Sequence, residues 1–548
     1  MAEHQDLAQP LEITTWAGRM ARFAQKRPGL AAAILGLIVA CGFPPIHAWY
    51  VALPALALFV AHLHAAPNWR AAAWRGWVFG WAMLTLANNW IATAFTFQAN
   101  MPTWLGWLAV PLLCIYLAVY PALAALIAHL AARRAGPLAF GAVVAASWIV
   151  TEWLRSWVFT GYPWPPLGLM LLGGWTSPGL AASLPWLGTY ALSGAALIIA
   201  TLIVWLTASR RWWALGAGAA SVVVGMLIPG FVGTPPTGGT RYTLVQPLIP
   251  QEEMNDGSKY EEQFQRAAAL TMENADQSRL VLWPESALPD FLEDGYPDRY
   301  YRATTYAADP ELARKRVAGV IGEKSILLAG VVNLDIGIRA DGSEGAVTAR
   351  NSVLALNGAG NITHHYAKEH LVPYGEYLPM EEWLSAIGLS QLTSGSVPYD
   401  PGPGPQTLDL GDYGHAGVQI CYEIVFSGQV VDRENRPDYL FNPSNDGWFG
   451  SWGPPQHLAQ ARMRALEEGL PVLRSTTTGI SAVIDSNGIV RQHVPTGEAG
   501  KLDGFIPAAK APTLFSQWGN ALPLAWAVLL ALLGLGVPRW LALRGARS

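Results

Sequence analysis

Cys421 is the residue whose place in the sequence best suits a nucleophile. The alternating apolar run AGVQI at 416–420 predicts a strand that ends at this cysteine, and residues 422–433 have apolar positions at helical spacing. On such a strand-to-helix elbow, a side chain is exposed at the end of a sheet and near the positive end of a helix, where a thiol loses its proton more easily. A buried structural cysteine could occupy the same place. The other motifs of the chain distinguish a nucleophile from a structural cysteine.

Three further segments carry residues that would complete such a site. Glu285 follows LVLWP at the C-terminal end of a predicted strand, Lys368 lies in the loop HYAKEHLVPYGEYLP, and the turn-rich segment FNPSNDGWFG contains Trp448 and Phe449. A carboxylate can take the proton of a thiol, whose ordinary pKa is about 8.5. A lysine beside the backbone N–H of Tyr422 would stabilise the oxyanion that forms when the thiol attacks an acyl carbonyl. Together these residues predict a thiol acyl-transfer site.

The composition is that of a membrane protein. Of the 548 residues, 52% are hydrophobic and 25 are Trp, and the charged fraction of 14% is well below the about 25% that is typical of soluble proteins. The net charge of −4 gives no indication of nucleic-acid binding. The three cysteines provide no disulfide framework.

Eight apolar segments reach or approach the about 20 residues needed to cross a bilayer. They are residues 28–44, 48–65, 76–97, 103–132, 137–158, 186–208, 212–232 and 521–541. Lys and Arg gather before the first segment, between the second and third, and after the fourth, sixth and last, and basic loops stay in the cytoplasm. This pattern predicts a multi-pass protein of a bacterial inner membrane, with the polar region between the last two spans on the periplasmic side.

The predicted domains follow from these spans. They are a cytoplasmic tail at 1–27, a membrane domain of seven spans at 28–232, a linker at 233–240, a catalytic domain at 241–510, and a final span with a cytoplasmic tail at 511–548. The catalytic domain alternates between strands and helices, as expected for a sheet covered on both faces. Strands are predicted near 242, 279, 325, 352, 416, 439, 471 and 481, and helices at 261–273 and 456–468. The long segments 286–324 and 380–414 are predicted to be loops, which often act as lids.

Two features of the membrane half have alternative interpretations. Glu152 and Arg155 lie three residues apart on one face of the fifth span, where ionisable groups mark a substrate-binding site or form an ion pair that anchors the helix. Cys41 ends the sequence IVAC, which is similar to the lipid-attachment box of a lipoprotein signal peptide. The long charged N-terminal region and six further spans favour instead a cysteine packed in a helix.

The motifs WPE, KEHLVPYGE, CYE and SNDGWFG, in this order and inside this topology, resemble the nitrilase superfamily with its Glu-Lys-Cys triad. More closely, the chain resembles the bacterial apolipoprotein N-acyltransferases. The resemblance extends from EWLRSWVFTGYPW in the fifth span, through VQPLIPQ at the start of the catalytic domain, to ARMRALEEGLPVLRSTTTGISAVID near its end. It implies a polytopic α-helical membrane bundle joined to an α/β domain that forms an α-β-β-α sandwich.

The resemblance also implies roles for individual residues. Glu285 would be the general base, Lys368 the oxyanion stabiliser and Cys421 the nucleophile. Glu376 and Glu423 match further acidic positions associated with activity, which would orient the lysine and the pocket.

The implied reaction transfers an acyl chain from a phospholipid, typically phosphatidylethanolamine, to the N-terminal diacylglyceryl-cysteine of a lipoprotein. It proceeds by a ping-pong cycle through a cysteine thioester and needs no metal or organic cofactor. A metal site at His364, His365 and His370 is not expected, because they share one short loop and no Cys or carboxylate cluster has ligand spacing.

Trp448 matches an aromatic position of the family near the substrate entrance. Both substrates carry acyl chains in the outer leaflet, so we expect apolar loop side chains to dip into lipid, namely Phe291, Leu292, Trp448 and Phe449.

Two other functions are compatible with these sequence features. A membrane-tethered amidase of the nitrilase type would use the same triad with water as the acceptor. A transporter or receptor would use the outer domain only to bind a ligand, and its function would not depend on the Cys421 thiol.

Overall fold

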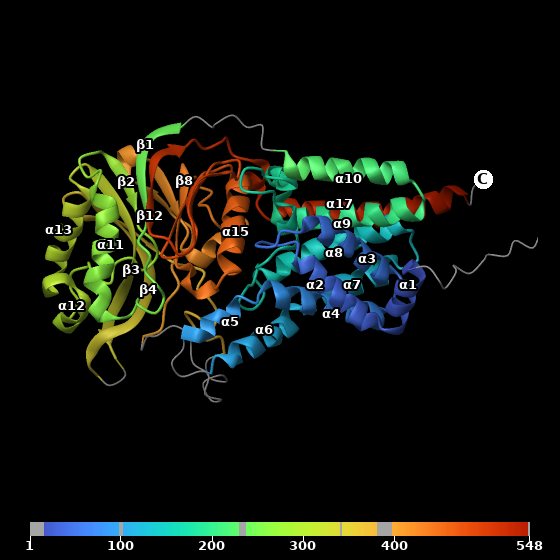
Figure 1. The fold of residues 1–548 in the computed structure, drawn as a ribbon, viewed down its shortest axis with the longest axis horizontal. Helices are drawn as coiled ribbons and strands as arrows, with labels where there is room; N and C mark the ends of the chain where they lie inside the picture. Colours follow the sequence, from blue (N-terminus) through green and yellow to red (C-terminus); the bar gives the residue numbers. More distant parts are fainter. Residues whose placement is uncertain (1–15, 98–101, 229–236, 340–341, 381–396, 546–548) are drawn as a thin grey trace, which may run out of the picture.

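The computed structural model describes residues 16–97, 102–228, 237–339, 342–380 and 397–545. It consists of a helical bundle and an α/β domain that lie end to end (Figure 1). Residues 1–15 of the predicted tail, 233–236 of the predicted linker and 381–396 of the second predicted loop lie outside the described residues.

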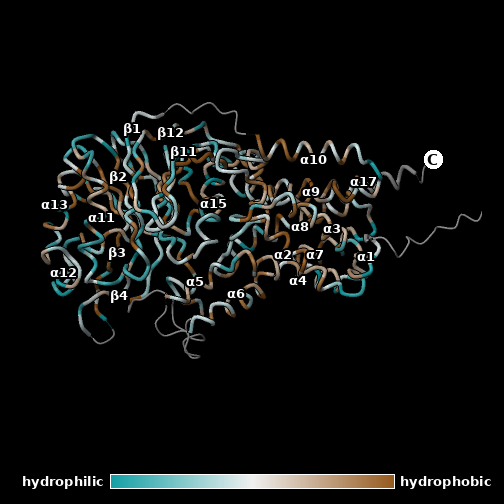
Figure 2. The backbone as a smooth tube through the Cα atoms, in the orientation of Figure 1, coloured by the Kyte–Doolittle hydropathy of each residue, from teal (hydrophilic) through white to brown (hydrophobic). Residues whose placement is uncertain are grey.

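Apolar helices form the bundle, and Figure 2 shows their hydrophobic colouring against the mixed colouring of the α/β domain. They are α1 (Trp16–Lys26), α2 (Pro28–Ala40), α3 (Trp49–His64), α4 (Trp69–Ala87), α5 (Ile91–Ala94), α6 (Trp104–Leu117), α7 (Val119–Ala132), α8 (Pro137–Arg155), α9 (Leu184–Ala208), α10 (Trp212–Leu227) and α17 (Ala521–Gly545). Small residues let these helices approach closely. A Cβ on Gly36 would lie 2.4 Å from the carbonyl oxygen of Phe79, and one on Gly76 would lie 2.6 Å from Cβ of Ala125.

Among the described residues, three helices are long and apolar enough to cross a membrane: Trp104–Ala132, Pro137–Arg155 and Leu180–Ala208. A fourth is possible if α1 and α2, which meet at a bend of 113°, form one span. The apolar helices Trp49–His64, Trp212–Leu227 and Ala521–Gly536 are shorter. The predicted span 76–97 is wrong in its boundaries, because α4 begins at Trp69 and ends at Ala87. The number of eight spans therefore stays a prediction.

Two six-stranded sheets form the centre of the α/β domain. The first has the order β12 (Gly500–Pro507), β1 (Thr237–Gln246), β2 (Arg279–Leu282), β3 (Ser325–Ile338), β4 (Glu344–Asn357) and β5 (Ile362–Ala367). The second has the order β11 (Val490–Val494), β10 (Ser481–Ile484), β9 (Val472–Thr476), β8 (Tyr439–Ser444), β7 (His415–Val418) and β6 (Thr407–Asp409). In each sheet the central strands pair in parallel, as β1–β2–β3 and β7–β8–β9 do.

Helices cover the outer face of each sheet and give the domain four layers (Figure 1). On one side, α11 (Tyr260–Met272) and α13 (Pro310–Ile321) enclose an apolar core with the first sheet. A second core fills the space between the sheets and reaches α15 (Gly453–Glu468). The opposite face of α15 packs into the core of the bundle through Ala459, Met463 and Leu466. This helix, which is buried on all sides, therefore joins the two parts of the protein.

Three local predictions in this domain are wrong. The predicted loop 286–324 contains α12 (Asp298–Thr304) and α13, because α13 buries an apolar face against the first sheet. Residues 237–240 of the predicted linker belong to β1, where Thr237 pairs with Pro507. The helix predicted after Cys421 is only the short 3-10 helix η7 (Cys421–Val425), since its apolar side chains are held in the core between the sheets rather than along one helical face.

Candidate active site

Glu285 lies three residues beyond the end of β2, where pairing with β3 continues. The N–H of Gly330 donates to the carbonyl of Pro284 at 3.1 Å. A Cβ on Gly330 would lie 2.6 Å from Cα of Glu285, so this approach of the two backbones requires glycine. The next residue, Ser286, has a φ of 51°, in the left-handed region. The adjacent backbone of β3 thus fixes the direction in which the buried Glu285 side chain points.

Lys368 follows β5 directly, and its side chain lies between two carboxylates. Its Nζ is 2.9 Å from Oε1 of Glu376 and 3.6 Å from Oε1 of Glu285. The side-chain amide of Asn351 donates to the same two oxygens, at 2.9 and 2.7 Å respectively. Burial alone would lower the pKa of Lys368, but Glu376 and Glu285 outweigh it and raise this pKa. The lysine is therefore a fixed buried cation.

Cys421 lies beyond β7, which ends at Val418, and has a φ of 51°. A left-handed conformation is strained for a cysteine and is often found at functional residues. Burial, and after it the Glu285 carboxylate, raise the pKa of the Cys421 thiol well above its ordinary value, while Lys368 lowers it. We expected the pKa of the Cys421 thiol to be lowered, and this expectation is wrong, because the pKa is raised. Desolvation outweighs the dipole of so short a helix, and the thiol needs a base.

A buried polar cluster supports the backbone of Cys421. Nε2 of His457 lies 3.0 Å from the carbonyl oxygen of Cys421, and Nδ1 lies 2.9 Å from Oδ1 of Asp446. Asp446 forms an ion pair of 2.7 Å with Arg474, which is also fully buried. Burial, followed by Arg474, lowers the pKa of His457 and keeps its ring neutral.

Glu423 links the turn at Cys421 to the loop that carries Lys368. Its carboxylate accepts the N–H of Ile420 at 2.7 Å, the N–H of Glu369 at 2.7 Å and the hydroxyl of Tyr366 at 2.9 Å. Burial raises the pKa of Glu423 to about 7, although the N–H groups of Glu369 and Ile420 oppose the shift. Glu423 therefore holds together the two segments that present Cys421 and Lys368.

The apolar loop side chains are not all available to lipid. Leu292 lies in the core beside the first sheet, and Phe449 is buried with its ring 4.7 Å from that of Trp90. The expectation that these two dip into lipid is wrong, because each fills a core. Phe291 packs against the rings of Tyr296 and Tyr300. Trp448 is half-buried, and its ring lies 5.7 Å from that of Phe97 in the bundle.

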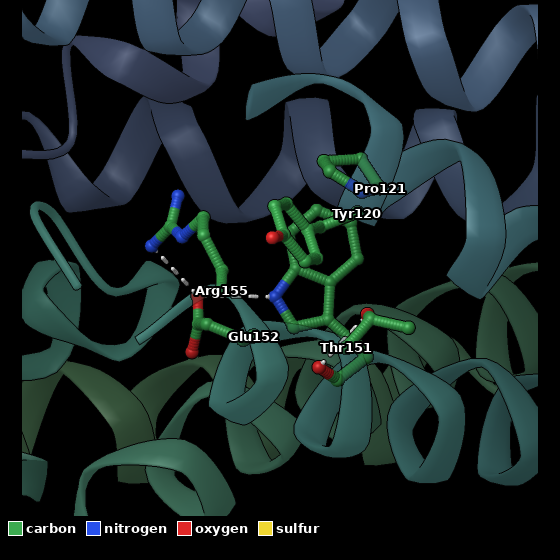
Figure 3. Close-up of a pocket in the computed structure, with 6 residues that line it drawn as sticks. Tyr120, Pro121, Thr151, Glu152 and Arg155 are labelled. Carbon is green, nitrogen blue, oxygen red and sulfur yellow. Dashed lines mark hydrogen bonds and ion pairs between the residues drawn. The ribbon is translucent and has the colours of Figure 1, made fainter. Parts of the chain in front are cut away.

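Glu152 and Arg155 are buried at the end of α8 that faces the α/β domain. Figure 3 shows them side by side at a small pocket, with Tyr120, Pro121 and Thr151 around it. Oε1 of Glu152 accepts the N–H of Leu167 at 2.8 Å, and Arg155 donates to the carbonyl of Pro165 at 2.8 Å. Both side chains thus hold the loop at 161–167, and a role in substrate binding stays a prediction.

This loop reaches the turn at Cys421. The hydroxyl of Tyr422 lies 3.3 Å from the carbonyl oxygen of Gly161, and the indole N–H of Trp164 donates to Gln456 of α15 at 2.7 Å. The bundle therefore contacts both the residue after Cys421 and the residue before His457.

Reasoning from the sequence missed several residues of the site. Asn351 precedes a predicted strand, Asn445 and Asp446 lie within the SNDGWFG motif, and His457 begins a predicted helix. The backbone N–H of Asn445 donates to Oε2 of Glu285 at 2.7 Å. Only the motif gave a signal for Asn445 and Asp446, and nothing in the sequence distinguished Asn351 or His457. Among the described residues, no group of three or more His, Cys, Asp or Glu side chains could hold a metal ion.

Two family models match the chain. Residues 35–202 match the apolipoprotein N-acyltransferase N-terminal domain, and residues 244–509 match carbon-nitrogen hydrolase. An apolipoprotein N-acyltransferase of Rhodopseudomonas palustris is 33% identical over 91% of this chain and 93% of its own length. The chain belongs to the apolipoprotein N-acyltransferase family. A relative of the same name from Caulobacter vibrioides is 32% identical over 91% of this chain and 92% of its own length.

The fold of the α/β domain is that of the nitrilase superfamily, with two sheets between layers of helices. Among solved structures, Nit3 of Saccharomyces cerevisiae, a member of this superfamily, is 19% identical and covers 50% of this chain and 92% of its own, with a TM-score of 0.34. The fold assignment rests on the family model and on the sheets themselves. With its apolar helices and its family, the chain is a membrane-bound acyltransferase.

Proposed function

We propose that this protein transfers an acyl chain from a phospholipid, with phosphatidylethanolamine as the donor, to the α-amino group of the N-terminal diacylglyceryl-cysteine of a lipoprotein. The acyl chain would be carried on Cys421 as a thioester. The observation that carries the proposal is that Lys368 lies 3.6 Å from Glu285, while the Glu423 carboxylate accepts the N–H of Glu369 and the N–H of Ile420 and so ties the segments of Lys368 and Cys421 together. Base, cation and thiol thus form one buried unit.

The first half-reaction forms the thioester. Glu285 takes the thiol proton as sulfur attacks the ester carbonyl, and Lys368 with the backbone N–H of Tyr422 stabilises the oxyanion. The ester C–O bond breaks, and the proton held by Glu285 passes to the leaving alkoxide, which departs as lysophospholipid. Because burial raises the pKa of the Cys421 thiol, its proton must pass to Glu285 while the sulfur attacks.

The second half-reaction transfers the acyl group. The amine of the lipoprotein attacks the thioester carbonyl, and the same cation and N–H stabilise the new oxyanion. The C–S bond breaks, and Glu285 takes a proton from the amine and passes it to the departing thiolate of Cys421. The residues of the chain thus suffice for both steps of the cycle.

The α/β domain is proposed to lie on the periplasmic side of the inner membrane. Arg70 lies in the first turn of α4, and Arg133 and Arg134 lie in the α7–α8 connection, at the end of α8 opposite to Arg155. Basic connections stay in the cytoplasm. This orientation places Cys421 near the outer leaflet, where a phospholipid and a diacylated lipoprotein are both anchored.

The test uses the full-length protein in detergent, phosphatidylethanolamine with a labelled acyl chain, and a diacylated lipopeptide. Intact-protein mass spectrometry after exposure to the lipid alone should show the mass of one acyl chain on Cys421, and addition of the lipopeptide should move the label to its amine. Cys421→Ala should abolish both products. Release of free labelled fatty acid without N-acylated peptide would instead establish a hydrolase, and full function of Cys421→Ala would establish a binding protein.

A further inference from the structure

A cluster of basic side chains lies inside the bundle at the end remote from the two sheets. Arg75 of α4 donates to the carbonyl of His62, the last-turn histidine of α3. His129, in the last turn of α7, lies four residues after Ala125, and a Cβ on Gly76, the residue after Arg75, would lie only 2.6 Å from Cβ of Ala125. Three separate helices thus bring their basic groups to one place.

Two members of this cluster are buried and have side-chain nitrogens without a hydrogen-bond partner. His129 is 2% exposed, and neither of its ring nitrogens has a hydrogen-bond partner. Arg75 is 8% exposed, and its Nε also has no partner. Exposed cations such as Arg133 can extend to the lipid headgroups, as basic residues near the ends of spans commonly do. That explanation does not extend to a buried guanidinium and a buried imidazole, whose polar atoms cost free energy when they stay unpaired.

The sequence offers these cations no acidic partner nearby. Between residues 13 and 240 the chain contains a single acidic residue, Glu152, and residues 512–548 contain none. Glu152 lies at the opposite end of α8, next to the α/β domain, where Arg155 and the N–H of Leu167 occupy it. In the described part of the bundle, the positive charge of the cluster is therefore not balanced by a carboxylate.

We propose that Arg75 and His129, together with Arg133, bind the phosphate group of an anionic phospholipid at this end of the bundle. A phosphate oxygen can accept hydrogen bonds from the guanidinium and from an imidazole N–H, and it supplies the missing negative charge. Basic pockets between membrane helices are suited to such headgroups. The helix α1 adds Arg19 and Lys26 at the same end, where Figure 1 shows it beside the bundle.

The test measures binding and thermal stability of the full-length protein in detergent, with phosphatidylglycerol, phosphatidylcholine or inorganic phosphate added. Phosphatidylglycerol should raise the melting temperature and remain bound in native mass spectra, whereas the zwitterionic lipid should do neither. Arg75→Gln and His129→Gln should each weaken phosphatidylglycerol binding by about tenfold, since each removes a direct donor to the anion. Arg211→Gln, which removes an exposed arginine of the α9–α10 connection, is the matched control and should change little.

The remaining outcomes separate the sources of the phosphate. If inorganic phosphate protects as well as phosphatidylglycerol, and Arg75→Gln removes both effects, the site takes free phosphate. No protection by either anion, or full protection of both Arg75→Gln and His129→Gln, overturns the proposal. Should Arg75→Gln fail to fold, the exposed Arg133→Gln gives the same comparison with a milder change.

Discussion

His457 lies with its Nε2 3.0 Å from the carbonyl oxygen of Cys421. A carbonyl can only accept, so Nε2 carries the proton, and Nδ1 accepts a hydrogen bond from Nη2 of Arg474 at 2.9 Å. The lowered pKa of the ring agrees with this neutral tautomer. The hydrogen bond holds the carbonyl of a residue whose φ is 51°. His457 belongs to α15, which packs on the bundle, so Cys421 is held by a helix that the membrane part fixes in place.

Replacing His457 should slow the chemistry without weakening lipid binding. We expect His457→Leu to lower kcat by about tenfold or more, because small displacements of a nucleophile are costly, while KM for the phospholipid changes little. His457→Gln can still donate a hydrogen bond to the carbonyl of Cys421 and should retain more activity. The measurement is the rate of thioester formation with labelled phospholipid. Equal rates for the two variants would show that the hydrogen bond has no role in positioning.

Gly330→Ala tests how tightly the base is positioned. Its Cβ would lie 2.6 Å from the Glu285 backbone, so the segment that carries the carboxylate must shift, and activity should fall by about tenfold or more. Gly319→Ala is the matched control, because nothing lies within 4 Å of its Cβ and it is on an exposed face of α13. That control should keep full activity and gain about 0.5–1 kcal/mol of stability. Comparable activity in the two variants would contradict the argument.

Much of the α/β domain was predictable from sequence patterns. The strands containing Leu282, Val353 and Leu440 are apolar over consecutive residues and became central strands of the two sheets, as burial on both faces requires. The short edge strands β6 and β11 were missed, because few of their residues are buried and their composition resembles a loop. The helix predicted after Cys421 failed since apolar spacing alone does not distinguish a helix from a buried loop.

The candidate site was predictable only where residues lie in motifs. Glu285, Lys368 and Cys421 each stand in a recognisable short sequence, and the structure brings them together from both sheets. Asn351 and His457 reach the site through hydrogen bonds to Glu285 and to Cys421, which are distant in the sequence. These contacts depend on how separate segments pack, and no local sequence pattern predicts that packing. The direction of the thiol pKa was likewise set by burial, which depends on the whole fold.

Alkylation of Cys421 should be slow at neutral pH and should accelerate only when the pH rises above the range in which an ordinary thiol ionises. A thiol whose folded pKa is raised stays protonated below that pKa, and only the thiolate reacts. In a Cys41→Ala, Cys114→Ala background, iodoacetamide labelling followed by mass spectrometry gives the rate at each pH. Glu285→Gln should shift the profile to lower pH, because the Glu285 carboxylate is one cause of the raised pKa. A rate that is already maximal at neutral pH would contradict the buried, protonated thiol.

Glu467→Gln should weaken the joint between the bundle and the α/β domain. Glu467 is fully buried on α15, accepts the N–H of Thr189 in α9 at 2.6 Å, and pairs with Arg464 at 3.0 Å. The amide leaves the buried guanidinium without its anion, which typically costs about 3–5 kcal/mol, so the melting temperature should fall by several degrees. Glu311→Gln removes the exposed ion pair with Lys315 and should cost less than about 1 kcal/mol. If calorimetry gives equal losses for both variants, the buried Glu467 carboxylate does not stabilise the joint.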